Sequence, residues 1–337
     1  MADVETNPPA LAVHDLRVGV GPSGRQSVVV DGVSFTVPAG GRLALVGESG
    51  SGKSMTAMAI AGLLPGRFRI LSGDIKLAGE TIDPMARSMT RRRGRDVSVV
   101  FQDPMSALNP VMTIGAQLIE AIRVDTAVSR KAARKRAIEL LEEVQIARAA
   151  ERLNAYPHEF SGGMRQRVMI AIALANRPRV LIADEPTTAL DVTTQVQILR
   201  LIDDLCRLEG AALLLITHDI GLVEGLCDDI CVLYGGRVME RGPVASVISQ
   251  PGHPYSNGLI SAIPPLDEDV PWLEPIAGEP AAAAHLGKGP ACPFAPRCPM
   301  VKQVCHTDRP DLQPIGPYVD AACHFASAQP GHRVNTS

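Results

Sequence analysis

The stretch that decides the fold runs from residue 47 to residue 54 and reads Gly47-Glu48-Ser49-Gly50-Ser51-Gly52-Lys53-Ser54. It has the form G-x-x-x-x-G-K-S of a phosphate-binding loop, in which main-chain N–H groups turn inward around the phosphates of a nucleotide. Residues 42–46 before it are typical of a buried strand, and residues 54–64 after it are typical of an apolar helix whose positive end points at the phosphates. The residues expected to bind the nucleotide are Gly47, Ser49, Gly50, Ser51, Gly52, Lys53, Ser54 and Met55.

A second apolar run, residues 180–183, ends in two carboxylates, Asp184 and Glu185. A run of this length predicts a central parallel strand, and ligands of open α/β sheets gather at the carboxyl ends of such strands. We expect Asp184 to hold Mg²⁺ through water, the Ser54 hydroxyl to ligate the same ion, and Glu185 to polarise the attacking water. An isolated Asp-Glu pair is commonly two solvated acids, but the phosphate loop upstream favours the catalytic interpretation.

Four further motifs carry a family resemblance. One segment resembles the signature of ATP-binding cassette (ABC) ATPases: Phe160-Ser-Gly-Gly-Met-Arg-Gln-Arg-Val168. Gln102 looks like the Q-loop of that family, Asp191 like its D-loop and His218 like its H-loop. The resemblance covers about residues 10–250. It implies an α/β fold of the P-loop NTPase class, with a mixed parallel core sheet, an antiparallel β subdomain and a helical subdomain, followed here by an irregular, cysteine-containing C-terminal extension.

The resemblance also implies roles for single residues. It implies that the catalytic residues are Glu185, His218 and Gln102. It also implies that the Mg²⁺ ion of the ATP complex is bound by Ser54, Gln102 and Asp184. In the family two such domains pair head to tail, so that the signature of one chain closes over ATP on the phosphate loop of its partner. Physically, a helix N-terminus then presents N–H groups to a phosphate across an interface. The residues that would contact the partner's ATP are Ser161, Gly162, Gly163, Met164 and Asp191.

Three segments are similar to the ATP-binding subunits of bacterial dipeptide and oligopeptide importers: residues 101–110, residues 157–169 and His253-Pro-Tyr255. This similarity implies a heterodimer with a second, different ATPase subunit, beneath two transmembrane permease subunits that receive peptide from an extracytoplasmic binding protein. It also implies a peripheral location on the cytoplasmic side of the cell membrane. The segment after Gln102 would form part of the groove that takes a permease's coupling helix.

Other functions stay open at this point. The same type of importer ATPase could serve nickel, glutathione or another small solute, because substrate selectivity lies in subunits absent from this chain. A non-transport ABC ATPase is a different class. Its translation factors carry two cassettes, whereas this chain has one phosphate loop. Its repair ATPases insert a long coiled coil between loop and signature, whereas Lys53 and Ser161 are only 108 positions apart. The family's base-stacking aromatic is missing near Val20, so we expect loose base selectivity.

Composition is consistent with an ATPase on the cytoplasmic side of a membrane. No apolar run approaches the roughly 20 residues that a membrane span needs, although 46% of the chain is hydrophobic. The first nine residues lack the basic end and apolar centre of a secretory signal. The net charge of −3 indicates no nucleic-acid surface.

Changes of composition along the 337 residues predict the domain boundaries. We expect a disordered N-terminus at residues 1–9 and a nucleotide-binding domain at residues 10–263, with its helical subdomain at about 105–175. A proline-rich change of composition after residue 263 predicts a C-terminal extension at residues 264–325. Residues 326–337 are expected to be a disordered tail.

The extension holds four of the seven cysteines, at Cys292, Cys298, Cys305 and Cys323. A cytosolic chain is kept reduced, so paired disulfides are not expected, and four thiolates in a weakly stabilised segment suggest a metal centre. Zinc would favour two Cys-x-x-Cys pairs, which this segment lacks. We therefore favour a structural or redox-sensing [4Fe-4S] cluster; zinc and no metal remain as alternatives.

Overall fold

The computed structural model describes residues 8–22, 25–124, 128–188, 190–263, 276–279 and 289–326. The expected disordered N-terminus, the proline-rich part of the extension and the expected disordered tail lie almost wholly outside these ranges. Tertiary contacts divide the chain into two units. The phosphate-loop unit comprises residues 12–36, 42–75 and 216–337, and the signature unit comprises residues 1–11, 37–41 and 76–215. A strand that crosses a boundary between the units belongs to the unit that holds most of its residues.

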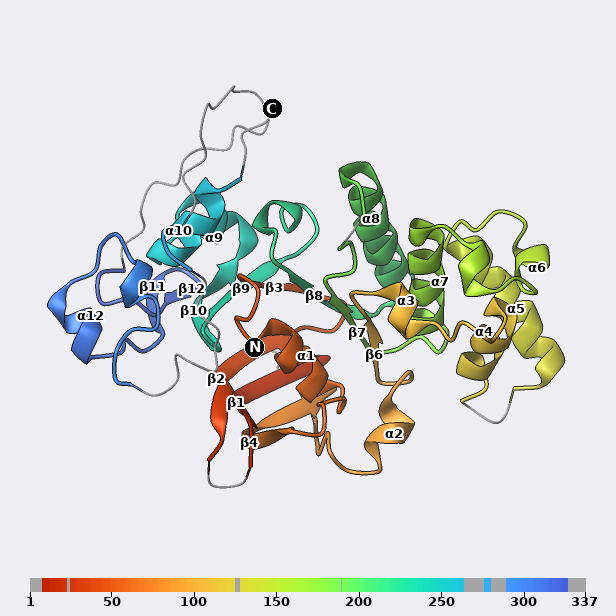
Figure 1. The fold of residues 1–337 in the computed structure, drawn as a ribbon, viewed down its shortest axis with the longest axis horizontal. Coiled ribbons are helices and arrows are strands. Elements are labelled where there is room, and N and C mark those ends of the chain that lie inside the picture. Colours follow the sequence, from red (N-terminus) through yellow and green to blue (C-terminus); the bar gives the residue numbers. More distant parts are fainter. Residues whose placement is uncertain are drawn as a thin grey trace, which may run out of the picture. The chain divides into compact units, whose positions relative to one another are not determined.

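The phosphate-loop unit is built around strands in the order β11-β12-β10-β9-β3 (Figure 1). Strands β3 and β9 are parallel, while β9 and β10 form an antiparallel hairpin that turns at Gly235 and Gly236. Every residue of β3 is buried, which is the pattern of a strand covered on both faces. The bounds are β3 Arg42–Val46, β9 Asp229–Tyr234, β10 Arg237–Pro243, β11 Gln313–Gly316 and β12 Val319–Ala321.

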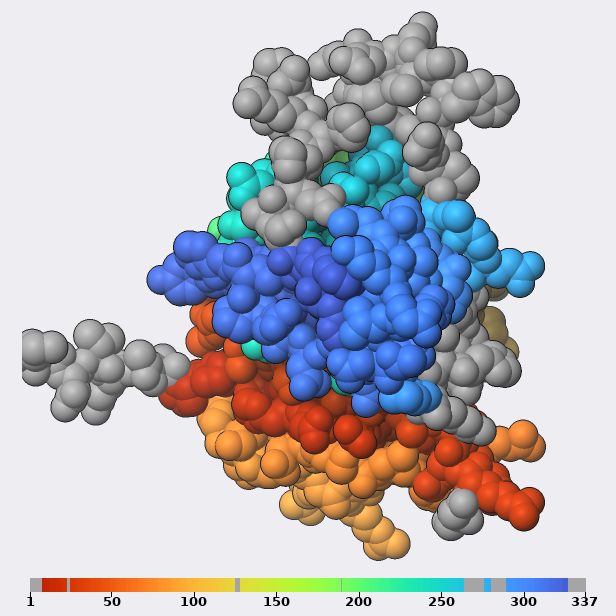
Figure 2. All heavy atoms as spheres, turned by 90° about the vertical axis from the view of Figure 1, so that its left-hand side faces the viewer, coloured from red at the N-terminus to blue at the C-terminus, as the bar shows by residue number. Residues whose placement is uncertain are grey.

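The same unit holds a smaller sheet in which β1 lies between β2 and β4, and several helices. The bounds of these elements are β1 Leu11–Val20, β2 Ser27–Val37, β4 Phe68–Leu77, α1 Lys53–Ile60, η2 Ile220–Leu222, α9 Val244–Ser249, α10 Pro254–Ser261, η3 Ala295–Arg297 and α12 Gln303–Thr307. Figure 2 shows the C-terminal residues, in blue, beside the N-terminal strands in red, and an ion pair of 3.4 Å between Arg309 and Asp31 joins these two segments.

The C-terminal extension is more regular than the sequence indicates. Strand β12 pairs antiparallel with β10, and β11 pairs antiparallel with β12. The two strands were missed because they are short and β11 contains Pro314. Phe294 of the extension is 1% exposed and packs edge-on against Tyr234, at 5.2 Å between ring centroids. The extension therefore shares one hydrophobic core with β3, β9, α9 and α10.

The signature unit contains the parallel pair β6 and β7, with β8 beside β7. Helices α4, α5, α6 and α7 gather beside these strands, as Figure 1 shows in yellow and green. Helix α5 buries Ala133, Ala137 and Leu140 on one stripe, and the Ser129 hydroxyl caps it by accepting from the N–H of Ala132. The bounds are β5 Glu80–Ile82, α2 Met89–Arg92, β6 Val97–Val100, α3 Pro104–Ala107, α4 Ile114–Ile122, α5 Arg130–Glu143, α6 Ala149–Arg152, η1 Pro157–Glu159, α7 Gly162–Leu174, β7 Val180–Asp184, α8 Val192–Glu209 and β8 Ala212–Thr217.

Candidate nucleotide site and cysteine pocket

The phosphate loop connects the buried end of β3 to the N-terminus of α1, as the sequence predicts. Its main chain passes so close to its surroundings that only glycine fits at two positions. A Cβ atom on Gly47 would lie 2.2 Å from the main-chain oxygen of Leu233, and one on Gly52 would lie 2.9 Å from that of Val29. Gly52 also has φ of +103°, in the range that favours glycine. The loop can therefore turn its N–H groups inward without side chains in the way.

Lys53 and Ser51 give the loop the chemistry of an anion site. Lys53 is 4% exposed, and its ammonium donates to the main-chain oxygens of Gly47 at 2.6 Å and Glu48 at 3.0 Å. The Ser51 hydroxyl is buried and has no hydrogen-bond partner within the described ranges. Ser49 and Gly50 are exposed at the crest of the loop, and Ser54 and Met55 are half-buried in the first turn of α1. A buried cation, an unpaired hydroxyl and a helix N-terminus fit the phosphates of a nucleotide.

The signature unit brings Gln102 and Glu185 together. Gln102 follows β6 and Glu185 follows β7, and because these strands are parallel neighbours, their carboxyl ends meet at one edge. The side-chain amide of Gln102 donates to Glu185 Oε2 at 3.2 Å, and the Thr188 hydroxyl donates to the same oxygen at 3.2 Å. Asp184, at the end of β7, is 6% exposed. Glu185 has φ of +44°, a backbone conformation that non-glycine residues adopt mostly at functional or strained sites.

The signature segment forms the N-terminus of α7. The Ser161 hydroxyl caps this helix by accepting from the N–H of Met164 at 3.3 Å. Ser161 and Gly162 are exposed, and Gly163 and Met164 are half-exposed, so the first turn is open to a ligand or a partner. Helix α7 is 13 residues long, and the positive end of its dipole lies at that first turn.

Two other predicted site residues lie on exposed turns. Asp191 is the N-cap of α8, and the N–H and hydroxyl of Thr194 bond to its carboxylate and lower its pKa below the ordinary value. His218 follows β8 and belongs to the phosphate-loop unit, as do the loop residues and Ser54. Gln102, Asp184, Glu185, Asp191 and the signature residues belong to the signature unit.

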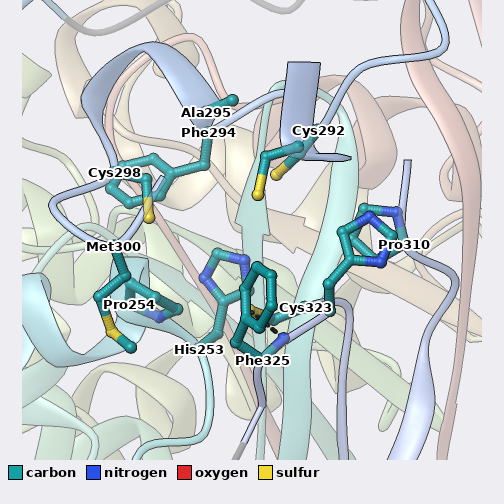
Figure 3. A pocket seen from close by; sticks show the side chains of 12 residues that line it. His253, Pro254, Cys292, Phe294, Ala295, Cys298, Met300, Pro310, Cys323 and Phe325 are labelled. Atoms are coloured by element: carbon teal, nitrogen blue, oxygen red, sulfur yellow. Dashed lines mark hydrogen bonds between the residues drawn. The ribbon is translucent and has the colours of Figure 1, made fainter. Parts of the chain in front are cut away.

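The four cysteines of the extension line a single pocket, together with His253, Phe294 and Phe325 (Figure 3). None of them is in a disulfide. Burial raises the pKa of the Cys292, Cys298 and Cys323 thiols, while main-chain N–H groups bonded to their sulfurs partly oppose that rise. One of these bonds runs from the Phe325 N–H to Cys323 Sγ, at 3.4 Å. Within the described ranges, no group of three or more His, Cys, Asp or Glu side chains could hold a single metal ion.

Two residues contact the phosphate loop without having been predicted to do so, although Tyr255 belongs to the importer-like segment His253-Pro-Tyr255. The Tyr255 hydroxyl accepts from the main-chain N–H of Glu48 at 2.8 Å, and Arg297 forms an ion pair with the Glu48 carboxylate. Arg297 lies 249 positions further along the chain, and no local pattern marks it. The only sequence signal was its place between Cys292 and Cys298.

Comparison with known proteins gives matches in both parts of the chain. The ABC transporter family matches residues 30–188, and the oligopeptide/dipeptide transporter C-terminal region matches residues 239–305. The oligopeptide transport ATP-binding protein OppD of Salmonella typhimurium is 45% identical over 313 residues, which cover 93% of this chain and 92% of that protein. A putative peptide import ATP-binding protein of Brucella abortus is 45% identical over 309 residues, covering 91% of this chain and 92% of that protein.

Solved structures give the same fold. The dimeric ATP-binding cassette MJ0796, bound to ADP and Pi, has a TM-score of 0.61 and 27% identity, and the match covers 69% of this chain and 98% of that one. The structure of cbiO1 from Clostridium perfringens, part of the ABC transporter complex cbiONQ, has the same TM-score of 0.61 and covers 71% of this chain and 90% of its own.

Proposed function

Because the chain belongs to the ABC transporter family and, within it, to the oligopeptide transport ATP-binding proteins, we propose that it binds and hydrolyses ATP to drive peptide import. The observation that carries the ATP part is the phosphate loop, in which the buried Lys53 ammonium is held against a main chain that admits only glycine at two points. The peptide part rests on the matched C-terminal region and on the relatives that cover nearly the whole chain.

In the proposed ATP site, the N–H groups of the loop and the Lys53 charge bind the β- and γ-phosphates. The Ser54 hydroxyl, Gln102 and Asp184 hold Mg²⁺, which neutralises charge on the phosphates. Glu185 accepts a proton from the attacking water, and His218 contacts the γ-phosphate. The hydrogen bonds from Gln102 and Thr188 to Glu185 support this role, because they orient its carboxylate.

Assembly would complete the site. The exposed first turn of α7 and the exposed Asp191 support a contact with ATP held by a second ATPase subunit, which we propose is a different chain. We further propose that the pair sits beneath two transmembrane permease subunits, which receive peptide from an extracytoplasmic binding protein. None of the helices within the described ranges could cross a membrane. The proposed association with the permeases supports a peripheral location, which we propose is on the cytoplasmic side of the membrane.

A groove in the signature unit supports permease binding. It lies beside α3, the segment that follows Gln102, and its apolar wall includes Phe101, Leu108, Met169 and Ile172. Met105 of α3, whose sulfur contacts the Arg165 guanidinium, is 55% exposed and adds apolar surface near this groove. We propose that this groove takes a permease's coupling helix. ATP-driven closure of the ATPase pair would then be passed to the membrane subunits.

We also propose that Cys292, Cys298, Cys305 and Cys323 bind a [4Fe-4S] cluster. A cubane is larger than one ion, so its four thiolates stand further apart than ligands at about 2.3 Å from a single Zn²⁺. The shared pocket and the N–H groups bonded to the sulfurs support this assignment, since such bonds stabilise cluster-bound thiolates. Anaerobically purified protein should be brown, absorb near about 400 nm and contain about four irons per chain. A colourless protein with stoichiometric zinc, or without metal, would contradict the assignment.

Two substitutions test the ATP site. Lys53→Ala removes the phosphate charge and should weaken ATP binding itself. Glu185→Gln keeps the shape of the side chain but cannot accept a proton, so it should spare ATP binding and abolish steady-state hydrolysis in the assembled transporter. Glu151→Gln, on a side chain 74% exposed in the same unit, is the matched control and should change neither. Hydrolysis by the Glu185→Gln complex within about threefold of wild type would show that Glu185 is not the principal base.

A further inference from the structure

The second residue of the phosphate loop, Glu48, is held at both ends of the residue. Its main-chain N–H donates to the Tyr255 hydroxyl at 2.8 Å. Its carboxylate accepts two hydrogen bonds from the Arg297 guanidinium, at 2.5 Å from Nη1 and 3.0 Å from Nη2. This is the bidentate geometry in which arginine binds a carboxylate most strongly. The Arg297 contact thereby ties the beginning of the loop to the C-terminal extension.

Arg297 is itself fixed on every side. Its Nε donates to the main-chain oxygen of Ala277 at 2.8 Å, and its Nη2 donates to that of Ile276 at 3.3 Å. The guanidinium lies 5.8 Å from the centroid of the Tyr234 ring. The side chain of Arg297 is 5% exposed, so its charge depends on Glu48 for compensation, and this pairing raises the pKa of Arg297 above its ordinary value. A guanidinium so constrained can hold Glu48 in one place.

The position of Arg297 is set by the cysteine-bearing turn. Arg297 ends η3, and the next residue, Cys298, donates its N–H to the main-chain oxygen of Ala295. At the other end of the turn, the N–H of Cys292 donates to the main-chain oxygen of Cys305 at 2.8 Å. Phe294, within the turn, packs on Tyr234 and Tyr255, with ring centroids 5.2 Å away in both cases. The same small core thus fixes both groups that hold Glu48.

We propose that Arg297 is a positioning residue for the phosphate loop, holding Glu48 so that the loop is already shaped for phosphate before ATP arrives. The inference rests on the proposed ATP site and adds a residue that lies outside every ATP motif. The loop is rich in glycine and gains conformational freedom when its contacts are lost. Without the Arg297 contact, ATP binding must order the loop, so affinity falls while the folded chain remains.

The test measures the affinity of the purified full-length chain for Mg·ATP by titration calorimetry. Arg297→Met removes the positive charge and the two parallel hydrogen bonds to Glu48. It should weaken the affinity for Mg·ATP about tenfold, the equivalent of about 1.4 kcal/mol. Arg297→Lys keeps the positive charge but cannot form the bidentate hydrogen bonds, so it should recover part of the lost affinity. The matched control is Asp320→Asn, which breaks an ion pair of 2.7 Å between the extension and Arg241 of β10, away from the loop. Its ATP affinity should stay within about twofold of wild type.

A double variant separates positioning from general destabilisation. Glu48→Gln with Arg297→Met should weaken ATP binding no more than Arg297→Met alone, because both changes break one contact. The proposal is overturned if folded Arg297→Met binds ATP within about twofold of wild type, or if the two effects multiply. Should circular dichroism show Arg297→Met unfolded, Glu48→Gln decides alone, and wild-type affinity in that variant overturns the proposal. If instead the wild-type chain binds no ATP, or Lys53→Ala binds it unchanged, the proposed site itself is wrong.

Discussion

Substituting Gly47 by alanine should damage the phosphate loop far more than alanine at another glycine with positive φ. The added Cβ would lie 2.2 Å from the Leu233 oxygen, against 3.4 Å or more for ordinary contact, so the loop or the end of β9 must move by more than an ångström. Overpacking of this kind costs about 2 kcal/mol, and backbone strain adds about 1 kcal/mol. We therefore expect the free energy of unfolding to fall by about 3 kcal/mol and ATP affinity by about a hundredfold.

The control for this experiment is Gly210→Ala. Gly210 also has positive φ, +68°, where it ends α8, but nothing lies within 4 Å of the position of its Cβ. Alanine there adds only backbone strain, so the free energy of unfolding should fall by about 1 kcal/mol and ATP affinity should not change. Urea denaturation followed by circular dichroism and ATP titration of both variants are the assays. The reasoning is refuted if Gly47→Ala is no less stable than Gly210→Ala and binds ATP like wild type.

Three further predictions concern assembly, the permease groove and a buried thiol. The purified chain alone should be mainly monomeric and hydrolyse ATP slowly, because the signature must come from another subunit; a stable, fully active homodimer seen by light scattering would contradict this. Asp103 caps α3 through the N–H groups of Met105 and Ser106, so Asp103→Ala should cost about 1 kcal/mol locally and reduce co-purification of the permeases without changing ATP affinity; unchanged co-purification would count against the groove. Burial raises the pKa of Cys231 to about 12, so iodoacetamide at pH 8 should label it only in unfolded protein, and rapid labelling of the native chain would contradict the burial.

The ATP motifs could be predicted from sequence because each is local. The loop at residues 47–54 needs its glycines and lysine in a fixed order, and the hairpin of β9 and β10 is marked by Gly235 and Gly236. Matches to the ABC transporter family and to its peptide-import relatives confirm the fold and the family. The assignment of single catalytic residues stays a prediction.

The contacts of the extension could not be predicted because they are long-range. Cys323 follows β12, whose pairing with β10 places it at the pocket that Cys298 also lines, and short strands carry little sequence signal. The pair of Arg297 and Glu48 joins residues 249 positions apart, and either side chain alone would pass as a solvated surface charge. Packing of Phe294 against Tyr234 and Tyr255 places Arg297 close to Glu48.

The central claim is that this chain is the ATP-hydrolysing subunit of a peptide importer. The most direct test is to purify the complex through a tag on this chain, reconstitute it in proteoliposomes with the binding protein, and measure the uptake of labelled oligopeptide together with ATP hydrolysis. We predict uptake that requires ATP and is lost, together with hydrolysis, in Glu185→Gln. Uptake of nickel or glutathione in place of peptide, or peptide uptake that survives Glu185→Gln, would contradict the claim.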